Sequence, residues 1–186
     1  MRRLTQFLIL IVLAILIIPI FLPNNIKAVA EKELEYPVEM VFEEFNNMSE
    51  FSKWEPWTHE DSAATKEFYS PYRGKGAGYK WSSKGKSGEI TILASTKNDS
   101  LVYDLEGYDL GKKSEMIIRF SSETPQSTKV VWTTESEKIK YFSRYYAYFT
   151  SDRIKEKLMK GFEFLETKLQ NAVSSSENTN NLDSAE

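Results

Sequence analysis

Hydrophobic and polar residues change their spacing along the chain, and the first segment is apolar throughout. From Leu4 to Leu22 no residue is charged, and Arg2 and Arg3 precede this run. A helix rises about 1.5 Å per residue, so the run is long enough to cross the hydrocarbon core of a bilayer. Basic residues favour the cytoplasmic side. We therefore expect residues 1–23 to be a transmembrane signal anchor, with a cytoplasmic N-terminus and an extracytoplasmic remainder.

Two alternatives remain open for this first segment. Ala28-Val29-Ala30 has the small residues of a signal-peptide cleavage site. The apolar run is long for a signal peptide, and Ala30 falls within the first predicted strand. A helix buried in a soluble core would have a similar composition. We favour the uncleaved anchor, although the sequence alone does not decide the cleavage.

Beyond the anchor the pattern predicts a domain over residues 26–170. Residues 26–37 alternate loosely and end at a proline, which cannot donate to a β-ladder. Residues 37–47 carry apolar side chains at helical spacing opposite acidic ones, and a second short helix follows over residues 48–54. A loop is expected over residues 55–64.

The period then changes to two, which predicts six further strands. Turn-type residues separate them, and connections this short join antiparallel strands. The strands are expected at residues 67–72, 78–83, 88–96, 100–108, 114–123 and 128–137. From about Arg144 to Leu169 the apolar positions recur at helical spacing, which predicts one long helix. Residues 171–186 are rich in Ser and Asn and predict a disordered tail.

Composition and charge exclude several classes of function. The formal net charge is -3, which argues against a nucleic-acid-binding surface. The chain has no cysteine, so disulfides, thiolate metal sites and cysteine nucleophiles are excluded, and His59 is the only histidine. We therefore predict no metal site and no cofactor.

The segment Gly85-Lys86-Ser87 has the letters of a phosphate-binding loop. Such a loop needs a glycine five residues earlier and a helix directly after the serine. Position 80 is lysine, and a strand pattern follows Ser87. Residues 84–88 are therefore predicted to form a hairpin turn, and no nucleotide is expected to bind.

Several segments, taken in order, resemble the START-like (SRPBCC) superfamily in its polyketide cyclase/dehydrase-like branch. The resemblance covers roughly residues 26–169. The segments are Tyr36–Phe45, Trp54-Glu55-Pro56-Trp57, Gly78–Trp81 with Gly88–Ile90, Thr128–Trp132 and Gly161–Leu165. It implies a mixed α+β helix-grip fold, in which a curved seven-stranded antiparallel sheet wraps a long C-terminal helix. It also implies a cavity between the sheet and that helix, in which family members bind lipids, sterols, polyketides or other apolar molecules.

The residues themselves suggest what would line this cavity. On a period-two strand Tyr79 and Trp81 share a face, as do Val130 and Trp132, so aromatic side chains would point at the helix. An apolar wall with a few polar groups is typical of a ligand pocket. The predicted ligand-binding residues are Trp54, Trp57, Tyr79, Trp81, Tyr103, Trp132 and Phe162. The alternative for Trp81 and Trp132 is simple core packing.

Two further segments have alternative interpretations. His59, oriented by Glu55, would suit acid–base catalysis, but a lone histidine beside Glu60 and Asp61 is more typical of a solvated loop. We predict no catalytic residue. The aromatic segment 141–149 would form either a rim that touches the bilayer or the packing of the helix start onto the sheet. We favour the packing.

The leading prediction is a membrane-anchored START-like domain that holds a hydrophobic small molecule or lipid. The alternatives are a cyclase or dehydratase acting on a polyketide-like substrate, in which Tyr79, Glu55 or His59 would polarise a carbonyl, and a protein-interaction module. The ligand, any reaction and the oligomeric state are not readable from the sequence.

Overall fold

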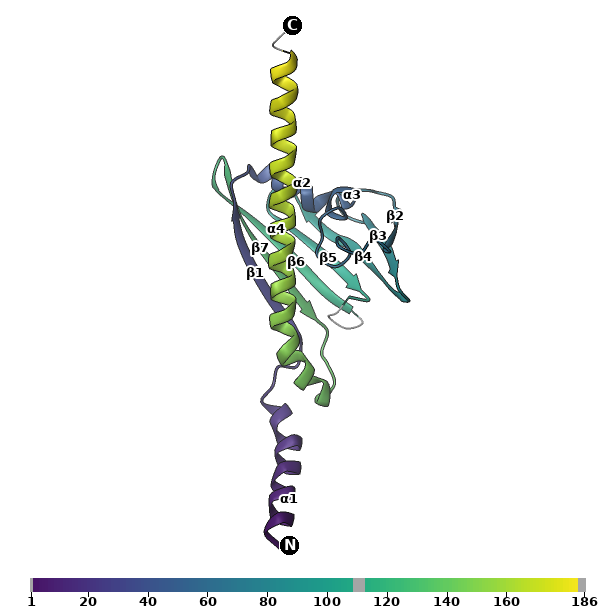
Figure 1. Ribbon diagram of the computed structural model, residues 1–186, viewed down its shortest axis with the longest axis vertical. Helices are drawn as coiled ribbons and strands as arrows, with labels where there is room; N and C mark the ends of the chain where they lie inside the picture. Colours follow the sequence, from purple (N-terminus) through teal and green to yellow (C-terminus); the bar gives the residue numbers. More distant parts are fainter. Residues whose placement is uncertain (1, 109–112, 184–186) are drawn as a thin grey trace.

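The computed structural model describes residues 2–108 and 113–183. The N-terminal helix α1 (Arg2–Ile17) and the short 3-10 helix η1 (Ile18–Ile20) extend from one end of the domain (Figure 1). No residue of α1 is buried. Pro19 in η1 is buried, because the start of the C-terminal helix contacts this end of the N-terminal segment.

The strands of the described residues form one seven-stranded sheet in the order β1-β7-β6-β5-β4-β3-β2, and every neighbouring pair is antiparallel. Their bounds are β1 Lys27–Leu34, β2 Thr65–Tyr69, β3 Gly78–Ser83, β4 Lys86–Thr96, β5 Ser100–Glu106, β6 Lys113–Thr124 and β7 Ser127–Ser136. Register shifts at Ile92/Ala94 and Ser122/Thr124 mark β-bulges, which bend a sheet. The predicted number and direction of the strands are confirmed.

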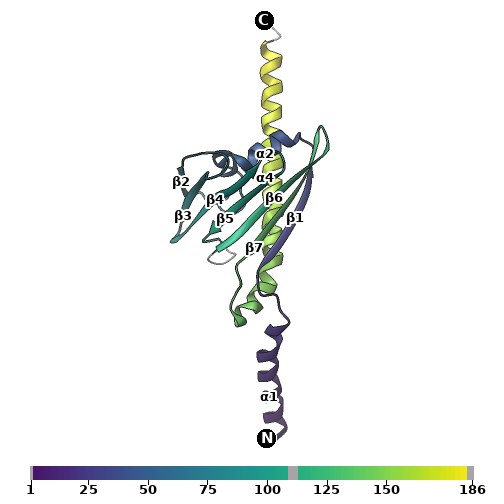
Figure 2. The ribbon, with the colours of Figure 1, turned by 180° about the vertical axis from the view of Figure 1, so that it is seen from behind.

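Three helices complete the domain. Two short ones, α2 (Val38–Asn46) and α3 (Met48–Phe51), lie between β1 and β2 in the chain. The 3-10 helix η2 (Tyr141–Ser143) leads into the long helix α4 (Arg144–Asp183). Figure 1 shows α4 crossing one face of the sheet. Figure 2 shows the molecule from the other side, where the sheet lies in front of α4. This is the predicted α+β helix-grip arrangement.

The core lies between the sheet and α4, because alternate strand residues point at the helix. In β7 every second residue is buried, which is the period-two pattern expected of a sheet covered on one face. From α4 the side chains of Ile154, Leu158, Phe162 and Leu165 enter this core at helical spacing.

Several predicted boundaries differ from the structure: the second strand is at 65–69 and not at 67–72, the fifth strand ends at Glu106 and not at residue 108, and the second short helix ends at Phe51 and not at residue 54. The first strand is shorter than residues 26–37 and ends at Leu34. The tail predicted to be disordered from residue 171 is helical as far as Asp183, and its side chains are exposed up to Ser175. The segment contains no glycine or proline to stop the helix, and extending an existing helix costs far less than starting one. Residues 184–186 lie outside the described residues.

The segment with the letters of a phosphate loop is a hairpin turn, as predicted. Ser83 pairs with Lys86 across the two-residue turn Lys84-Gly85, and both turn residues have positive φ values, of 49° and 79°. This backbone is typical of a tight hairpin. The strand β4 begins directly after the turn, where a phosphate loop would begin a helix.

Candidate functional site

Four of the predicted ligand-binding residues form the centre of an aromatic core. The ring of Trp132 lies 5.9 Å from that of Trp54 and 5.6 Å from that of Phe162, measured between centroids. Tyr103 stacks on Phe51 at 5.8 Å, and its hydroxyl donates a 2.8 Å hydrogen bond to the carbonyl oxygen of Phe45. Trp54, Tyr103, Trp132 and Phe162 are thus packed against neighbouring rings, and none of them lines the cavities described below.

Two of the other three predicted residues line a cavity beside this core. Trp57 and Trp81 line a cavity of about 230 Å³, together with Tyr108, which follows β5. The ring of Tyr108 lies 5.2 Å from Trp57 and 5.4 Å from Trp81. We call these three residues the aromatic mouth. Tyr79 precedes Trp81 by two residues on the same face of β3; it is fully buried and does not line this cavity.

Trp81 reaches this position because the residue paired with it across the strands is a glycine. Gly88 lies opposite Trp81 in the β3–β4 ladder, and a Cβ atom at Gly88 would come within 2.6 Å of the indole nitrogen. The indole therefore lies over the bare backbone of β4. Polar residues surround the cavity, and they include Asp61, Ser83, Lys84, Lys86 and Lys157.

Sequence reasoning missed Tyr108, for a local reason. In β5 the buried residues are Leu101, Tyr103 and Leu105, so the period-two pattern places position 107 inside. Gly107 has a φ of +77°, which breaks the alternation, and Tyr108 turns into the interior in its place. The signal available in the sequence was the glycine directly before an aromatic residue at a strand end.

Eight buried polar side-chain atoms on the inward side of the sheet and the neighbouring loop have no hydrogen-bond partner among the described residues. Native structures have only a few such atoms, and each one costs about 1–3 kcal/mol. In this region they are the indole nitrogens of Trp54, Trp57, Trp81 and Trp132 and the hydroxyls of Tyr79, Tyr108, Ser114 and Thr134. Ser114 and Thr134 continue the inward faces of β6 and β7, so the period-two pattern could have found them.

The two tyrosines of this set stay neutral at physiological pH. Burial raises the pKa of Tyr79 well above its ordinary value, and the nearby Tyr108 and Glu55 raise it further. Burial likewise raises the pKa of Tyr108. Both phenols are therefore hydrogen-bond donors. A molecule that enters past the aromatic mouth would meet indole N–H and phenol O–H groups, while the carboxylates of Asp61 and Glu55 lie, respectively, at the cavity wall and close to the two phenols.

The carboxylate of Glu55 is fully buried and already occupied. It accepts hydrogen bonds from the backbone N–H of Trp57 at 2.8 Å and of Thr58 at 3.2 Å, and from the Thr58 hydroxyl. The ammonium group of Lys66 lies 3.1 Å from the same carboxylate. These contacts fold the loop that carries Trp57, so Glu55 positions the mouth.

The structure does not bring His59 to this site. Its side chain is exposed, its Nδ1 atom contacts the carbonyl oxygen of Lys53, and its ring lies 4.4 Å from that of Phe164 on α4. Glu55 and His59 therefore make no acid–base pair through their side chains. Among the described residues, no group of three or more His, Asp or Glu side chains is placed to hold a metal ion.

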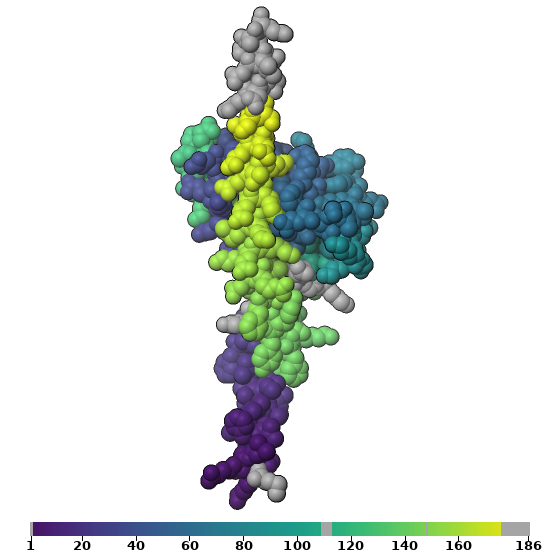
Figure 3. All heavy atoms as spheres, in the orientation of Figure 1, coloured from purple at the N-terminus to yellow at the C-terminus, as the bar shows by residue number. Residues whose placement is uncertain are grey.

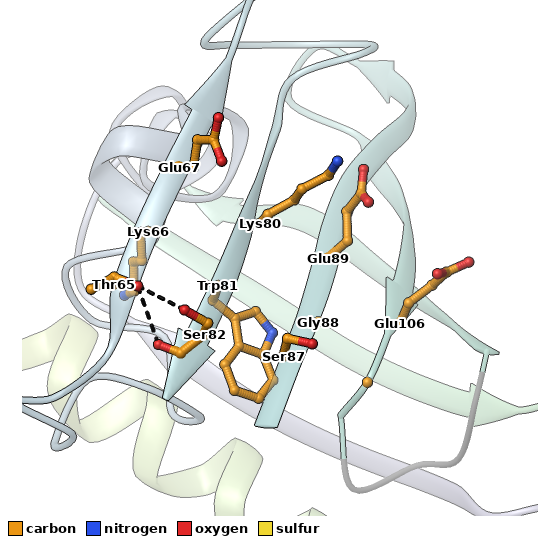
Figure 4. Close-up of a pocket in the computed structure, with 11 residues that line it drawn as sticks. Thr65, Lys66, Glu67, Lys80, Trp81, Ser82, Ser87, Gly88, Glu89 and Glu106 are labelled. Carbon is orange, nitrogen blue, oxygen red and sulfur yellow. Dashed lines mark hydrogen bonds between the residues drawn. The ribbon is translucent and has the colours of Figure 1, made fainter. Parts of the chain in front are cut away.

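A larger cavity, of about 690 Å³, lies where β2, β3 and β4 run side by side (Figure 4). Its lining is mixed and includes Trp81 as well as the charged residues Lys66, Glu67, Lys80, Glu89 and Glu106. Thr65 and Ser82 join two of these strands by a 2.8 Å hydrogen bond between hydroxyls. Because Lys80 and Ser82 point away from the core, this cavity is not the predicted apolar one.

One helix of the described residues, counted as Arg2–Ile20, is long and apolar enough to cross a membrane. It lies near the N-terminus, where a signal sequence would have the same pattern. Its large apolar side chains are exposed almost throughout.

Comparisons with known proteins support the fold. No family model and no curated protein matches the chain. Among solved structures, MLL2253 from Mesorhizobium loti has a TM-score of 0.56 and 16% identity, over 78% of this chain and 97% of that one. CalU16 from Micromonospora echinospora has a TM-score of 0.52 and 14% identity, over 77% and 73%. DynU16, a protein of the dynemicin biosynthetic locus, has a TM-score of 0.56 and 11% identity, over 79% and 48%. At these identities the likeness concerns the fold alone.

Proposed function

We propose that this protein is a membrane-anchored helix-grip domain that binds a hydrophobic small molecule or lipid through the aromatic mouth. The observation that carries the proposal is that the indole N–H groups of Trp57 and Trp81, which line the mouth, are buried without a hydrogen-bond partner among the described residues, as is the hydroxyl of Tyr108 by distance. Leaving them buried and unpaired is unfavourable, and a ligand with an acceptor oxygen would pair some of them. The expected ligand is therefore mostly apolar and carries a carbonyl, ester or carboxyl group.

The size of the cavity fits partial entry of such a ligand. About 230 Å³ is below the usual range of pockets that enclose a drug-sized molecule, which begins at roughly 300 Å³. The predicted residues deeper in the core are packed ring against ring. A larger ligand would need these rings to turn aside, so the mouth is the part of the site at which binding would begin.

The proposed anchor places this mouth close to a source of apolar ligands. If α1 spans the membrane, only a few residues separate it from β1 and the domain is held near the lipid surface. The strands β3 and β5, whose ends carry the mouth, run toward the end of the domain at which α1 lies (Figure 1). The basic residues at the N-terminus favour an extracytoplasmic domain.

The comparisons support a small-molecule ligand without naming it. One structural neighbour belongs to a biosynthetic locus, and the fold is shared. We found no side-chain pair that favours the cyclase or dehydratase alternative, because the Glu55 carboxylate is occupied and the His59 ring lies elsewhere. The proposal is therefore binding, without a reaction.

The test uses the full chain in lipid nanodiscs, titrated with palmitate, cholesterol and an anthraquinone while tryptophan fluorescence is followed. Empty nanodiscs correct for partition of each probe into lipid. Tyr108→Phe keeps the ring and removes one donor, and Tyr72→Phe, on an exposed loop, is the matched control. One lost hydrogen bond is expected to weaken binding by up to about tenfold. Equal affinities of Tyr108→Phe and Tyr72→Phe for every probe that binds would contradict the proposed site.

A further inference from the structure

The beginning of α4 is hydrogen-bonded to the end of the N-terminal apolar segment. The hydroxyl of Tyr145 donates a 2.8 Å hydrogen bond to the carbonyl oxygen of Ile15, and the hydroxyl of Tyr141 donates to that of Leu16. The Arg144 guanidinium donates a 3.0 Å bond to the carbonyl oxygen of Pro19. Figure 3 shows the corresponding segments in contact at the junction of α1 and the domain.

Proline explains why the carbonyl group of Ile15 needs a partner from outside the helix. In an α-helix the carbonyl of residue 15 accepts from the N–H of residue 19, and Pro19 has no N–H. The turn that follows is a 3-10 helix, which changes the partners of the last carbonyls. The two tyrosine hydroxyls and the arginine therefore satisfy acceptors at the end of the apolar run.

An exposed apolar stripe lies on the same segment as these donors. Phe142, Tyr146 and Phe149 are spaced four and three residues apart, which places them on one side of the chain, and they are 59%, 54% and 68% exposed. An adjacent side of the helix carries Ala147 and Thr150, which are buried. We call Tyr141, Phe142, Tyr145, Tyr146 and Phe149 the aromatic collar.

We propose that the aromatic collar is a second membrane-contacting surface, which lies in the interface of the bilayer that α1 spans. The proposed occupant is lipid, at the boundary between headgroups and acyl chains. Ile15 lies seven residues before Leu22, the end of the apolar run expected to span the membrane, so the Tyr145 hydroxyl reaches roughly 10 Å into that run. An interfacial element is buried to a similar depth, about 5–10 Å.

The chemistry of the collar fits this depth. Tyrosine has an apolar body and a polar tip, and it is enriched where membrane meets water. A carbonyl left unpaired in hydrocarbon costs several kcal/mol, so the bonds from Tyr141 and Tyr145 matter more in lipid than in water. The collar thereby fixes the domain to the end of its anchor. This inference rests on the anchoring part of the proposed function and is independent of ligand binding.

The chain has no cysteine, so single labels can report the depth of each position. Phe142→Cys and Tyr146→Cys, in the full chain reconstituted into phosphatidylcholine vesicles, are labelled with an NBD fluorophore. Gln126→Cys, in the exposed turn between β6 and β7, is the control for a position away from the membrane. Ile11→Cys, within α1, reports the anchor itself.

Lipid with a doxyl quencher near the headgroup is expected to quench labels at positions 142 and 146 and to spare position 126. Aqueous iodide should quench the first two roughly fivefold less than position 126, because they lie below the headgroups. Equal iodide quenching at positions 142, 146 and 126 would overturn the collar. Shielding from iodide without quenching by doxyl lipid would also overturn it, because a second copy or another protein would then cover the stripe.

Two further readouts test separately whether α1 spans the bilayer and whether Tyr145 holds the collar in place. If the label at position 11 is not quenched by lipid that carries the doxyl group near the end of its acyl chain, the anchor fails, and the proposed membrane location fails with it. Tyr145→Phe keeps the ring and removes the bond to Ile15, and it should raise the iodide accessibility of a label at position 142. Tyr72→Phe should leave that accessibility unchanged. No difference between the two variants would refute the fixing role of Tyr145.

Discussion

Gly161 of α4 lies directly against the indole ring of Trp132 on β7. A Cβ atom at Gly161 would come within 3.0 Å of Cζ3 of Trp132 and within 3.1 Å of two ring carbons of Pro56. The missing side chain therefore lets α4 approach both the sheet and the loop that carries the aromatic mouth. Trp132 has little freedom to move aside, because Phe45, Trp54 and Phe162 pack around it.

Gly161→Ala is expected to destabilise the domain although alanine favours a helix. The gain in helix propensity is about 1 kcal/mol, whereas overpacking a core costs about 1–3 kcal/mol. We expect a net loss of about 1 kcal/mol in the free energy of unfolding, measured by denaturation followed by circular dichroism. Lys155→Ala, at an exposed position of the same helix, is the control. A Gly161→Ala variant that is more stable than the unchanged protein would contradict the prediction and show that the Trp132 ring can move aside.

Lys66→Met should destabilise the protein because it leaves the buried carboxylate of Glu55 without its ion-pair partner. The Lys66 side chain is 16% exposed and that of Glu55 is 0% exposed. Removing one partner of a buried pair costs about 3 kcal/mol or more. The same measurement on Lys27→Met, which breaks an exposed pair with Glu135, should show a loss below about 1 kcal/mol. Similar losses for both variants would contradict the positioning role given to Glu55.

The fold was predictable from the sequence because its signals are local. Alternation in residues 78–83 and 128–137 predicted strands that face the helix, and the turn at Lys84-Gly85 fixed one register. The site was less predictable. Trp132 and Phe162 carry the pattern of a cavity wall, but whether such rings line a space or fill it depends on packing between distant elements. The bond from Tyr145 to Ile15 likewise joins residues 130 positions apart.

Alkaline pH should unfold the domain before its buried tyrosines ionise. Burial raises the folded-state pKa of Tyr79, Tyr103 and Tyr108 well above the ordinary value of 10.0. Their contribution to stability is fully present below the unfolded pKa and decreases as the pH rises above it toward the folded pKa. The slope is about 1.4 kcal/mol per pH unit for each group. Phenolate absorbance should therefore rise in two steps, the second coinciding with loss of the circular dichroism signal. A single step in the folded protein would contradict this burial.

Acid should weaken the contact between α4 and α3. Hydrogen bonds from Lys168 and Lys53 hold the pKa of Glu50 below its ordinary value. A depressed carboxyl pKa contributes stability above the unfolded pKa, and this contribution is lost as the pH falls through the folded pKa. Glu50 is partly exposed, so the effect should stay below about 1 kcal/mol. In acid titrations followed by tryptophan fluorescence, Lys168→Met should unfold at a higher pH than Lys27→Met. Identical midpoints would contradict the prediction.

Native mass spectrometry of the full chain, released from nanodiscs before and after extraction with organic solvent, tests the binding proposal most directly. We predict that the protein carries a discrete additional mass, which extraction removes. After extraction, incubation with a probe that changes the tryptophan fluorescence should add the mass of that probe. A protein that carries no additional mass and takes up neither palmitate, cholesterol nor an anthraquinone would contradict the account.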